Sequence, residues 1–177
     1  MRFNQKWEAT IVDCNNKTES KYFPARVPGN LQSDYARFIG IDDLMYSDNT
    51  EKLRETENCT FEYRTYLNFK SNPSEKIYFV AEGIDYRYDI ILDSEILYSG
   101  IGMFTKIEVD ITNIVHINSE LKVRIYPHPK KEGSRKNSRD EATDSCKPPM
   151  CYGWDWNPRL LISGMWLPAF IETPDSF

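Results

Sequence analysis

The chain has 177 residues, enough for one domain with its own hydrophobic core, and we expect residues 1–177 to form a single domain. Its net charge of −5 argues against nucleic-acid binding, which depends on neutralising phosphates, and no apolar run approaches the roughly 20 residues that span a bilayer. No apolar segment typical of a signal peptide follows Met1. We therefore expect a soluble protein with no nucleic-acid and no membrane partner. It is cytoplasmic unless a leader has been removed, in which case it is periplasmic or secreted.

Apolar and polar side chains alternate with a period of two along much of the chain, which predicts β-strands. Such runs occupy residues 62–69, 77–81, 88–93, 107–111, 121–126 and 165–171, with turn clusters such as 71–74 between them. Helix is scarce. The segment 30–38 predicts one short helix capped by Asn30, and 50–57 predicts a further helical turn. The pattern predicts an all-β fold, a two-sheet antiparallel sandwich with one or two short helices.

The stretch between Pro127 and Pro149 has a different character. Residues 130–147 are polar, heavily charged and without periodicity, which predicts a mobile surface loop. Its basic residues are diluted by acidic ones, so a nucleic-acid patch is the weaker interpretation. The loop leads directly into a tryptophan-rich turn, where it is placed to close over a ligand or partner.

The four cysteines form an even set, which permits disulfides without requiring them. They are Cys14, Cys59, Cys146 and Cys151. The last two are five residues apart and are either paired or free. Zinc is not expected, because the chain has no Cys-x-x-Cys motif and its two histidines lie far from that pair in sequence. Structural thiols or one disulfide are the favoured interpretation, with no metal and no cofactor.

Residues 151–166 hold three of the four tryptophans of the chain. Trp154 and Trp156 offer large apolar ring faces, and Asp155 between them is an ionised hydrogen-bond acceptor. A pyranose matches this mixture, since its apolar C–H face lies on an aromatic ring while its hydroxyls bind a carboxylate or guanidinium. The alternative is a core tryptophan pair with a surface aspartate in the turn.

The string Gly-Trp-Asp-Trp-x-Pro-Arg at 153–159, followed by Ser-Gly-Met-Trp, resembles the end of the amino-terminal sugar-binding domain of glycoside hydrolase family 2, in its β-mannosidase branch. Further segments resemble that domain in the expected order and cover essentially the whole chain, namely Trp7, 25–29, 42–46, 60–64, 83–85, 103–104 and 109–112. Two positions depart from the family pattern. Asp93-Ser94 replaces the usual Asn-Gly turn of the central hairpin, and Gly102 stands where an Asn is common.

The resemblance implies a galactose-binding-domain-like jelly roll whose sugar site is the Trp-Asp-Trp turn. Asp155 would accept hydrogen bonds from hydroxyls of a terminal β-linked mannose or similar hexose. Arg159 would orient that acid or touch the sugar, and Trp154 and Trp156 would shape the wall. The two catalytic glutamates of this retaining family stand on a downstream barrel, so we expect no catalytic residue in this chain and an interaction with downstream domains of the same polypeptide.

Two function classes remain at this point. In the first, the chain is a non-catalytic domain of an exo-β-mannosidase-like enzyme, with the β-galactosidase and β-glucuronidase branches as alternatives for specificity. In the second, it is a stand-alone lectin-like carbohydrate-binding module. Sequence beyond Phe177 discriminates between them, because a barrel with a glutamate pair supports only the first.

Overall fold

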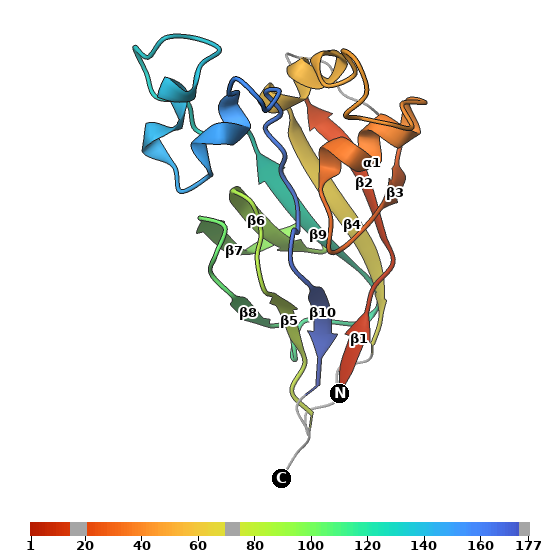
Figure 1. The fold of residues 1–177 in the computed structure, drawn as a ribbon. Helices are drawn as coiled ribbons and strands as arrows, with labels where there is room; N and C mark the ends of the chain where they lie inside the picture. Colours follow the sequence, from red (N-terminus) through yellow and green to blue (C-terminus); the bar gives the residue numbers. More distant parts are fainter. Residues whose placement is uncertain (15–20, 70–74, 174–177) are drawn as a thin grey trace.

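The structure, a computed structural model, describes residues 1–14, 21–69 and 75–173 as two facing antiparallel sheets (Figure 1). The smaller sheet has the strand order β1 (Arg2–Asn4), β10 (Ala169–Glu172), β5 (Tyr78–Ala81), β8 (Ile107–Asp110). The larger has the order β3 (Phe23–Ala25), β2 (Trp7–Asp13), β4 (Thr60–Asn68), β9 (Ile117–Tyr126), β6 (Arg87–Leu92), β7 (Glu95–Ile101). The all-β, two-sheet antiparallel sandwich predicted from the sequence is confirmed.

The core lies between the sheets and is made by the alternating residues of the predicted runs. On β4, Phe61, Tyr63 and Leu67 are fully buried, and their inward side chains pack against those of the facing sheet. Full burial of a large apolar side chain contributes about 1.5–3 kcal/mol. Between them on the same strand, Glu62 and Arg64 take the other face, where they form ion pairs with neighbouring strands. The period of two therefore marks the inner and outer faces of the sheet correctly.

The last predicted run, 165–171, is shorter than expected. Strand β10 begins only at Ala169, although Met165 is completely buried. At Gly164 the backbone has φ of 147°, and a Cβ there would lie 2.7 Å from the hydroxyl oxygen of Tyr63 and 3.0 Å from Cα of Asn30. The chain here passes close to other backbone and pairs only through an isolated antiparallel bridge between Gly164 and Asp85. The predicted turn at 71–74 lies outside the described residues.

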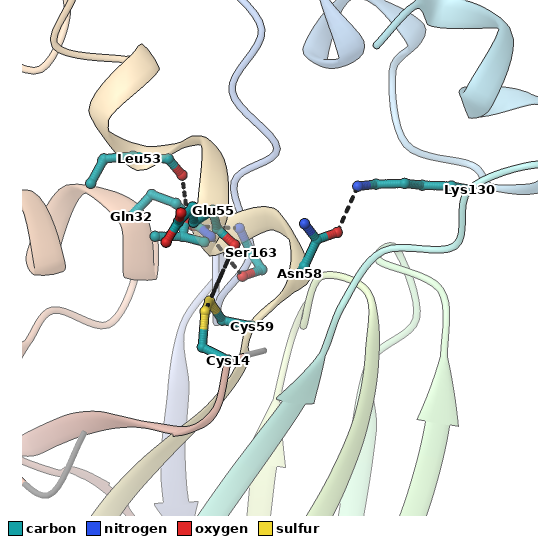
Figure 2. The surroundings of a disulfide bond; sticks show 9 residues. Cys14, Gln32, Leu53, Glu55, Asn58, Cys59, Lys130 and Ser163 are labelled. Atoms are coloured by element: carbon teal, nitrogen blue, oxygen red, sulfur yellow. Dashed lines mark hydrogen bonds between the residues drawn. A yellow bond between two sulfur atoms is a disulfide. The ribbon is translucent and has the colours of Figure 1, made fainter. Parts of the chain in front are cut away.

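The predicted helical segments are present. Helix α1 (Leu31–Phe38) begins after Asn30, whose side-chain oxygen accepts a hydrogen bond from Ser33 N at 2.8 Å. Gln32 and Ser163 exchange two hydrogen bonds, which tie the helix to the segment leading into β10 (Figure 2). The second segment is the 3₁₀ helix η1 (Glu51–Asn58).

Two further 3₁₀ helices follow, the first within the predicted surface loop 130–147 and the second just after it. They are η2 (Arg139–Asp144) and η3 (Pro149–Tyr152), which lie close together at one end of the molecule. Glu141, Ala142 and Lys147 are buried, so the segment carries packed side chains as well as exposed ones. Sequence periodicity fails here because 3₁₀ turns this short do not repeat an apolar face. The mobility of the segment stays a prediction.

All four helical elements gather at one end of the sandwich, while β1 and β10 pair at the other (Figure 1). A disulfide between Cys14 and Cys59 joins the end of β2 to the start of β4, next to η1 (Figure 2). Cys146 and Cys151 are free. No helix among the described residues is long and apolar enough to cross a membrane.

Candidate sugar-binding site

The Trp-Asp-Trp segment forms a tight, self-bonded turn. Trp154 N donates to Asn157 O at 2.9 Å, and Asn157 N donates back to Trp154 O at 3.2 Å. The amide of Asn157 also donates to Met150 O at 3.0 Å, which fastens the turn to η3. Asp155 and Trp156 therefore stand at the tip, and both are exposed. Trp156 is therefore not part of a core tryptophan pair.

The two indole rings of the turn lie together but differ in environment. Their centroids are 5.3 Å apart with the planes tilted by 49°. Trp154 is partly buried, and the guanidinium carbon of Arg139 lies 3.9 Å from its ring centroid. Trp156 is 73% exposed. Of the two rings, Trp156 thus has the greater free surface for a ligand, and Trp154 is covered on one face by a cation.

Arg159 lies beneath the turn in a buried ion-pair cluster. Its side chain is 4% exposed and donates to both oxygens of Glu57, at 2.9 and 3.1 Å, and to Glu141 at 2.6 Å. Its donors are occupied by η1 and η2, and its ion-pair partners in the described structure do not include Asp155. The arrangement connects three segments that are far apart in the sequence and holds the base of the turn.

Electrostatics agree with a fully charged cluster. Burial alone would raise the pKa of Glu57, but hydrogen bonds from Arg159 and Lys130 outweigh it and lower the pKa. Lys130 Nζ donates to Glu57 at 3.0 Å and to Asn58 at 2.8 Å, the second bond being drawn in Figure 2. Next to it, the buried Tyr152 donates its hydroxyl to Pro129 O at 3.1 Å. The base of the site is thus fixed by charge-assisted bonds.

The turn forms one side of an open pocket of about 430 Å³. Arg135, Asn137 and Ser138 line it from the loop before η2, and Arg139 lines it from the start of η2. Residues 152–155 and 157–159 complete it. Asp155 is the one carboxylate among these lining residues. The volume lies within the range of pockets that hold a small ligand, and the lining suits a polyhydroxylated one.

A second buried cluster holds the far end of the loop. Lys147 Nζ donates to a carboxylate oxygen of Asp85 and to Ile162 O, the latter at 2.7 Å. His128 Nε2 donates to the same Ile162 carbonyl at 2.8 Å. Burial lowers the pKa of His128 to about 4, although the charge of Asp85 opposes this. Lysine is rarely buried without such a partner, so this cluster has a structural explanation and does not face the pocket.

Sequence reasoning found the turn but missed what surrounds it. Trp154, Asp155 and Trp156 form the turn, with Arg159 beneath them. In the sequence, Glu57, Arg139 and Glu141 are only parts of charged stretches. Their roles depend on contacts across as many as 102 residues, which no local pattern records. Within the described part of the chain, no group of three or more His, Cys, Asp or Glu side chains is placed to hold a metal ion.

Fold and site together define a β-sandwich domain with a polar, aromatic-edged pocket at one end. The profile of the family described as glycosyl hydrolase 2 galactose-binding domain-like matches residues 7–167, and the chain belongs to this family.

Its relatives include β-mannosidases. The β-mannosidase of Rattus norvegicus is 24% identical over 177 residues, and that of Capra hircus is 26% identical over 178. Each alignment covers 89% of this chain but 20% of the relative, so the chain spans about a fifth of their length. The crystal structure of β-D-mannosidase from Dictyoglomus thermophilum has a TM-score of 0.71 at 23% identity, covering 97% of this chain and 22% of that one. An exo-chitosanase of Amycolatopsis orientalis shares the fold, with a TM-score of 0.66 at 16% identity.

Proposed function

We propose that this chain is the non-catalytic amino-terminal carbohydrate-binding domain of an exo-β-mannosidase-like glycoside hydrolase. In this proposal it completes the terminal-sugar pocket of a catalytic barrel in the same polypeptide. The observation that carries the proposal is Asp155, an exposed carboxylate held between two tryptophans at the tip of a hydrogen-bonded turn. Family membership and the β-mannosidase relatives support the same conclusion.

Each residue of the turn has a distinct role in the proposal. Asp155 accepts hydrogen bonds from hydroxyls of the terminal hexose, and the exposed ring of Trp156 offers an apolar face to its C–H surface. Trp154 forms the wall behind them. Arg159, whose donors are occupied by Glu57 and Glu141, positions the turn from below.

The test is Asp155→Asn in the full-length protein that carries this chain. The side-chain amide of asparagine keeps one acceptor oxygen but carries no charge. Its NH₂ group is a hydrogen-bond donor at the position where the carboxylate would accept a hydrogen bond from a sugar hydroxyl. We expect the free energy of unfolding to change by less than about 1 kcal/mol, because the turn is closed by backbone bonds rather than by this side chain. We expect kcat/KM on 4-nitrophenyl β-mannoside to fall roughly ten- to a thousandfold, equivalent to about 1.4–4 kcal/mol.

Asp48→Asn is the matched control. Asp48 is an aspartate with a 72% exposed side chain outside the pocket lining, and its replacement should leave kcat/KM within about twofold of the wild type. Wild-type turnover of Asp155→Asn together with a lowered melting temperature would assign Asp155 to capping the turn and remove the basis of the proposal.

A further inference from the structure

We infer that Arg139 is a second sugar-binding residue of this pocket, and that it acts as the donor opposite the acceptor Asp155. The pair selects a neutral hexopyranoside over an acidic or amino sugar. This inference rests on the proposed function and adds to it a residue from outside the Trp-Asp-Trp turn.

The guanidinium of Arg139 is oriented while its donors remain free. Its central carbon lies 3.9 Å from the ring centroid of Trp154, a stacking distance for a cation on an indole. The side chain is exposed, lines the pocket, and has no hydrogen bond or ion pair with the described part of the chain. The N–H groups of a guanidinium point outward in its own plane, so they can bind oxygen atoms of a ligand while its face covers the indole ring.

The backbone that carries Arg139 is fixed relative to the turn. Glu141, two residues further along η2, accepts a hydrogen bond from Arg159 on its carboxylate at 2.6 Å, and Glu141 O accepts one from Lys131 N at 3.1 Å. Ala142 is buried in a small apolar cluster with Tyr152. Because the same Arg159 holds the base of the turn, a single buried cluster sets the positions of both Arg139 and Asp155.

The charges lining the pocket determine the class of sugar. Arg135 pairs with Asp140 at 3.5 Å, and Arg159 is neutralised by two glutamates. The remaining lining charges are the cation of Arg139 and the anion of Asp155, which cancel. An acidic sugar would be attracted by Arg139 but repelled by Asp155, and an amino sugar the reverse, so neither gains net charge stabilisation to offset the desolvation of its own charge. A neutral sugar satisfies both residues, donating hydroxyl protons to one and accepting N–H from the other.

The test is Arg139→Leu in the full-length protein. Leucine still covers the face of Trp154 but has no donors, so the variant separates hydrogen bonding from packing. We expect kcat/KM on 4-nitrophenyl β-mannoside to fall about ten- to a hundredfold, the loss expected for hydrogen bonds to a charged group. Arg139→Lys should lose less, since it keeps the charge without the planar fork. The melting temperature should stay within about 2 °C of the wild type.

Arg87→Leu is the matched control, because Arg87 is also exposed and also stacks on an aromatic ring, that of Tyr126 at 4.7 Å, outside this pocket. Its kcat/KM should remain within about twofold of the wild type. If Asp155→Asn loses activity while Arg139→Leu does not, the proposed function stands and the role of Arg139 is overturned. If neither variant loses activity, the proposed function itself fails. A larger kcat/KM for the β-glucuronide than for the β-mannoside in the wild type would overturn the preference for a neutral sugar.

Discussion

Arg159 places a permanent positive charge in the interior, where two glutamates neutralise it. Its side chain is 4% exposed and bridges η1 to η2 through Glu57 and Glu141. Removal of Arg159 would leave Glu141 buried without its cation and Glu57 paired with Lys130 alone. Arg159 thus stabilises the fold by pairing with the two buried glutamates and not by its own burial.

We therefore expect Arg159→Leu to lower the free energy of unfolding by about 3–5 kcal/mol at pH 7. Adding Glu57→Gln and Glu141→Gln to this variant removes the two buried carboxylate charges that Arg159 neutralised. It should therefore restore part of the lost free energy of unfolding. Urea denaturation of the single and triple variants measures both effects. A single variant within about 1 kcal/mol of the wild type would show that water reaches the glutamates and that the cluster is not closed.

The sequence predicts a functional charge at Arg159 but not its partners. The string Gly-Trp-Asp-Trp-x-Pro-Arg marks the position because of its unusual composition. Glu57, however, comes from a charged segment 102 residues earlier, where any of several acidic residues would satisfy the same local pattern. Arg139 is likewise one of several basic residues in a charged stretch. Only the folded arrangement selects which of them meets the turn.

His128 makes stability depend on pH. Burial lowers its pKa in the folded protein to about 4, with the charges of Asp85, Lys147 and Lys130 acting on it as well, whereas an unfolded histidine titrates near 6.5. Between these values the unfolded chain binds a proton that the folded protein does not. The contribution is therefore complete above pH 6.5 and is lost as the pH falls towards 4.

From this linkage the wild type should lose about 2 kcal/mol of unfolding free energy between pH 7 and pH 4.5 through His128 alone. His128→Gln keeps an N–H for the carbonyl of Ile162 but does not titrate, so its pH dependence should be shallower by that amount. Urea titrations of both proteins at the two pH values provide the comparison. Parallel pH profiles would mean that folding does not lower the pKa of His128.

At the scale of elements, the turn of the hairpin between β6 and β7 holds two residues in an unfavourable backbone conformation. Both residues of its two-residue turn have positive φ, 48° at Asp93 and 78° at Ser94, as the right-handed twist of the strands requires. Asp93 compensates by accepting a hydrogen bond from Glu120 N at 2.8 Å. Ser94 has no such compensation from its side chain in the described structure, so it bears the strain that glycine avoids.

Ser94→Gly should therefore raise the free energy of unfolding by about 1 kcal/mol. Asp93→Gly is the informative counterpart, since it relieves strain at the neighbouring position but removes the acceptor of Glu120 N, and it should give no net gain. Thermal unfolding of both variants distinguishes them. Equal stabilisation by the two would show that the hydrogen bond contributes nothing.

The elements that the sequence predicts are those in which one face is buried over several residues. Strand β9 alternates through its last eight residues and α1 carries its own cap, so both are recognisable locally. Strands β1 and β3 have three residues each, and η3 has four, too few to repeat a pattern. Their structure depends on the partner strand or on the buried clusters that they join, and these tertiary contacts are not visible in a local sequence pattern.

On the scale of the whole molecule, the two sheets form a supporting core and one end of the sandwich carries the candidate site. The two sheets share one continuous apolar core, while α1 and the three 3₁₀ helices collect at one end together with the Trp-Asp-Trp turn (Figure 1). The Cys14–Cys59 disulfide and the Arg159 cluster both fasten η1, one to the sheet and one to the turn. Loops held in this way on a rigid core are suited to present a preformed binding surface.

The same architecture predicts that the isolated chain hydrolyses no glycoside. Retaining hydrolysis needs two carboxyl groups about 5–5.5 Å apart, one of them protonated as the acid. The pocket has one carboxylate among its lining residues, Asp155. The nearby pair Glu57 and Glu141 is buried against Arg159, and the lowered pKa of Glu57 keeps it ionised, the opposite of what a general acid requires. Pure chain incubated with 4-nitrophenyl β-mannoside should therefore release no nitrophenol above the rate of buffer. Release that disappears on replacing Asp155, Glu57 or Glu141 would show that this end of the sandwich holds a complete catalytic site.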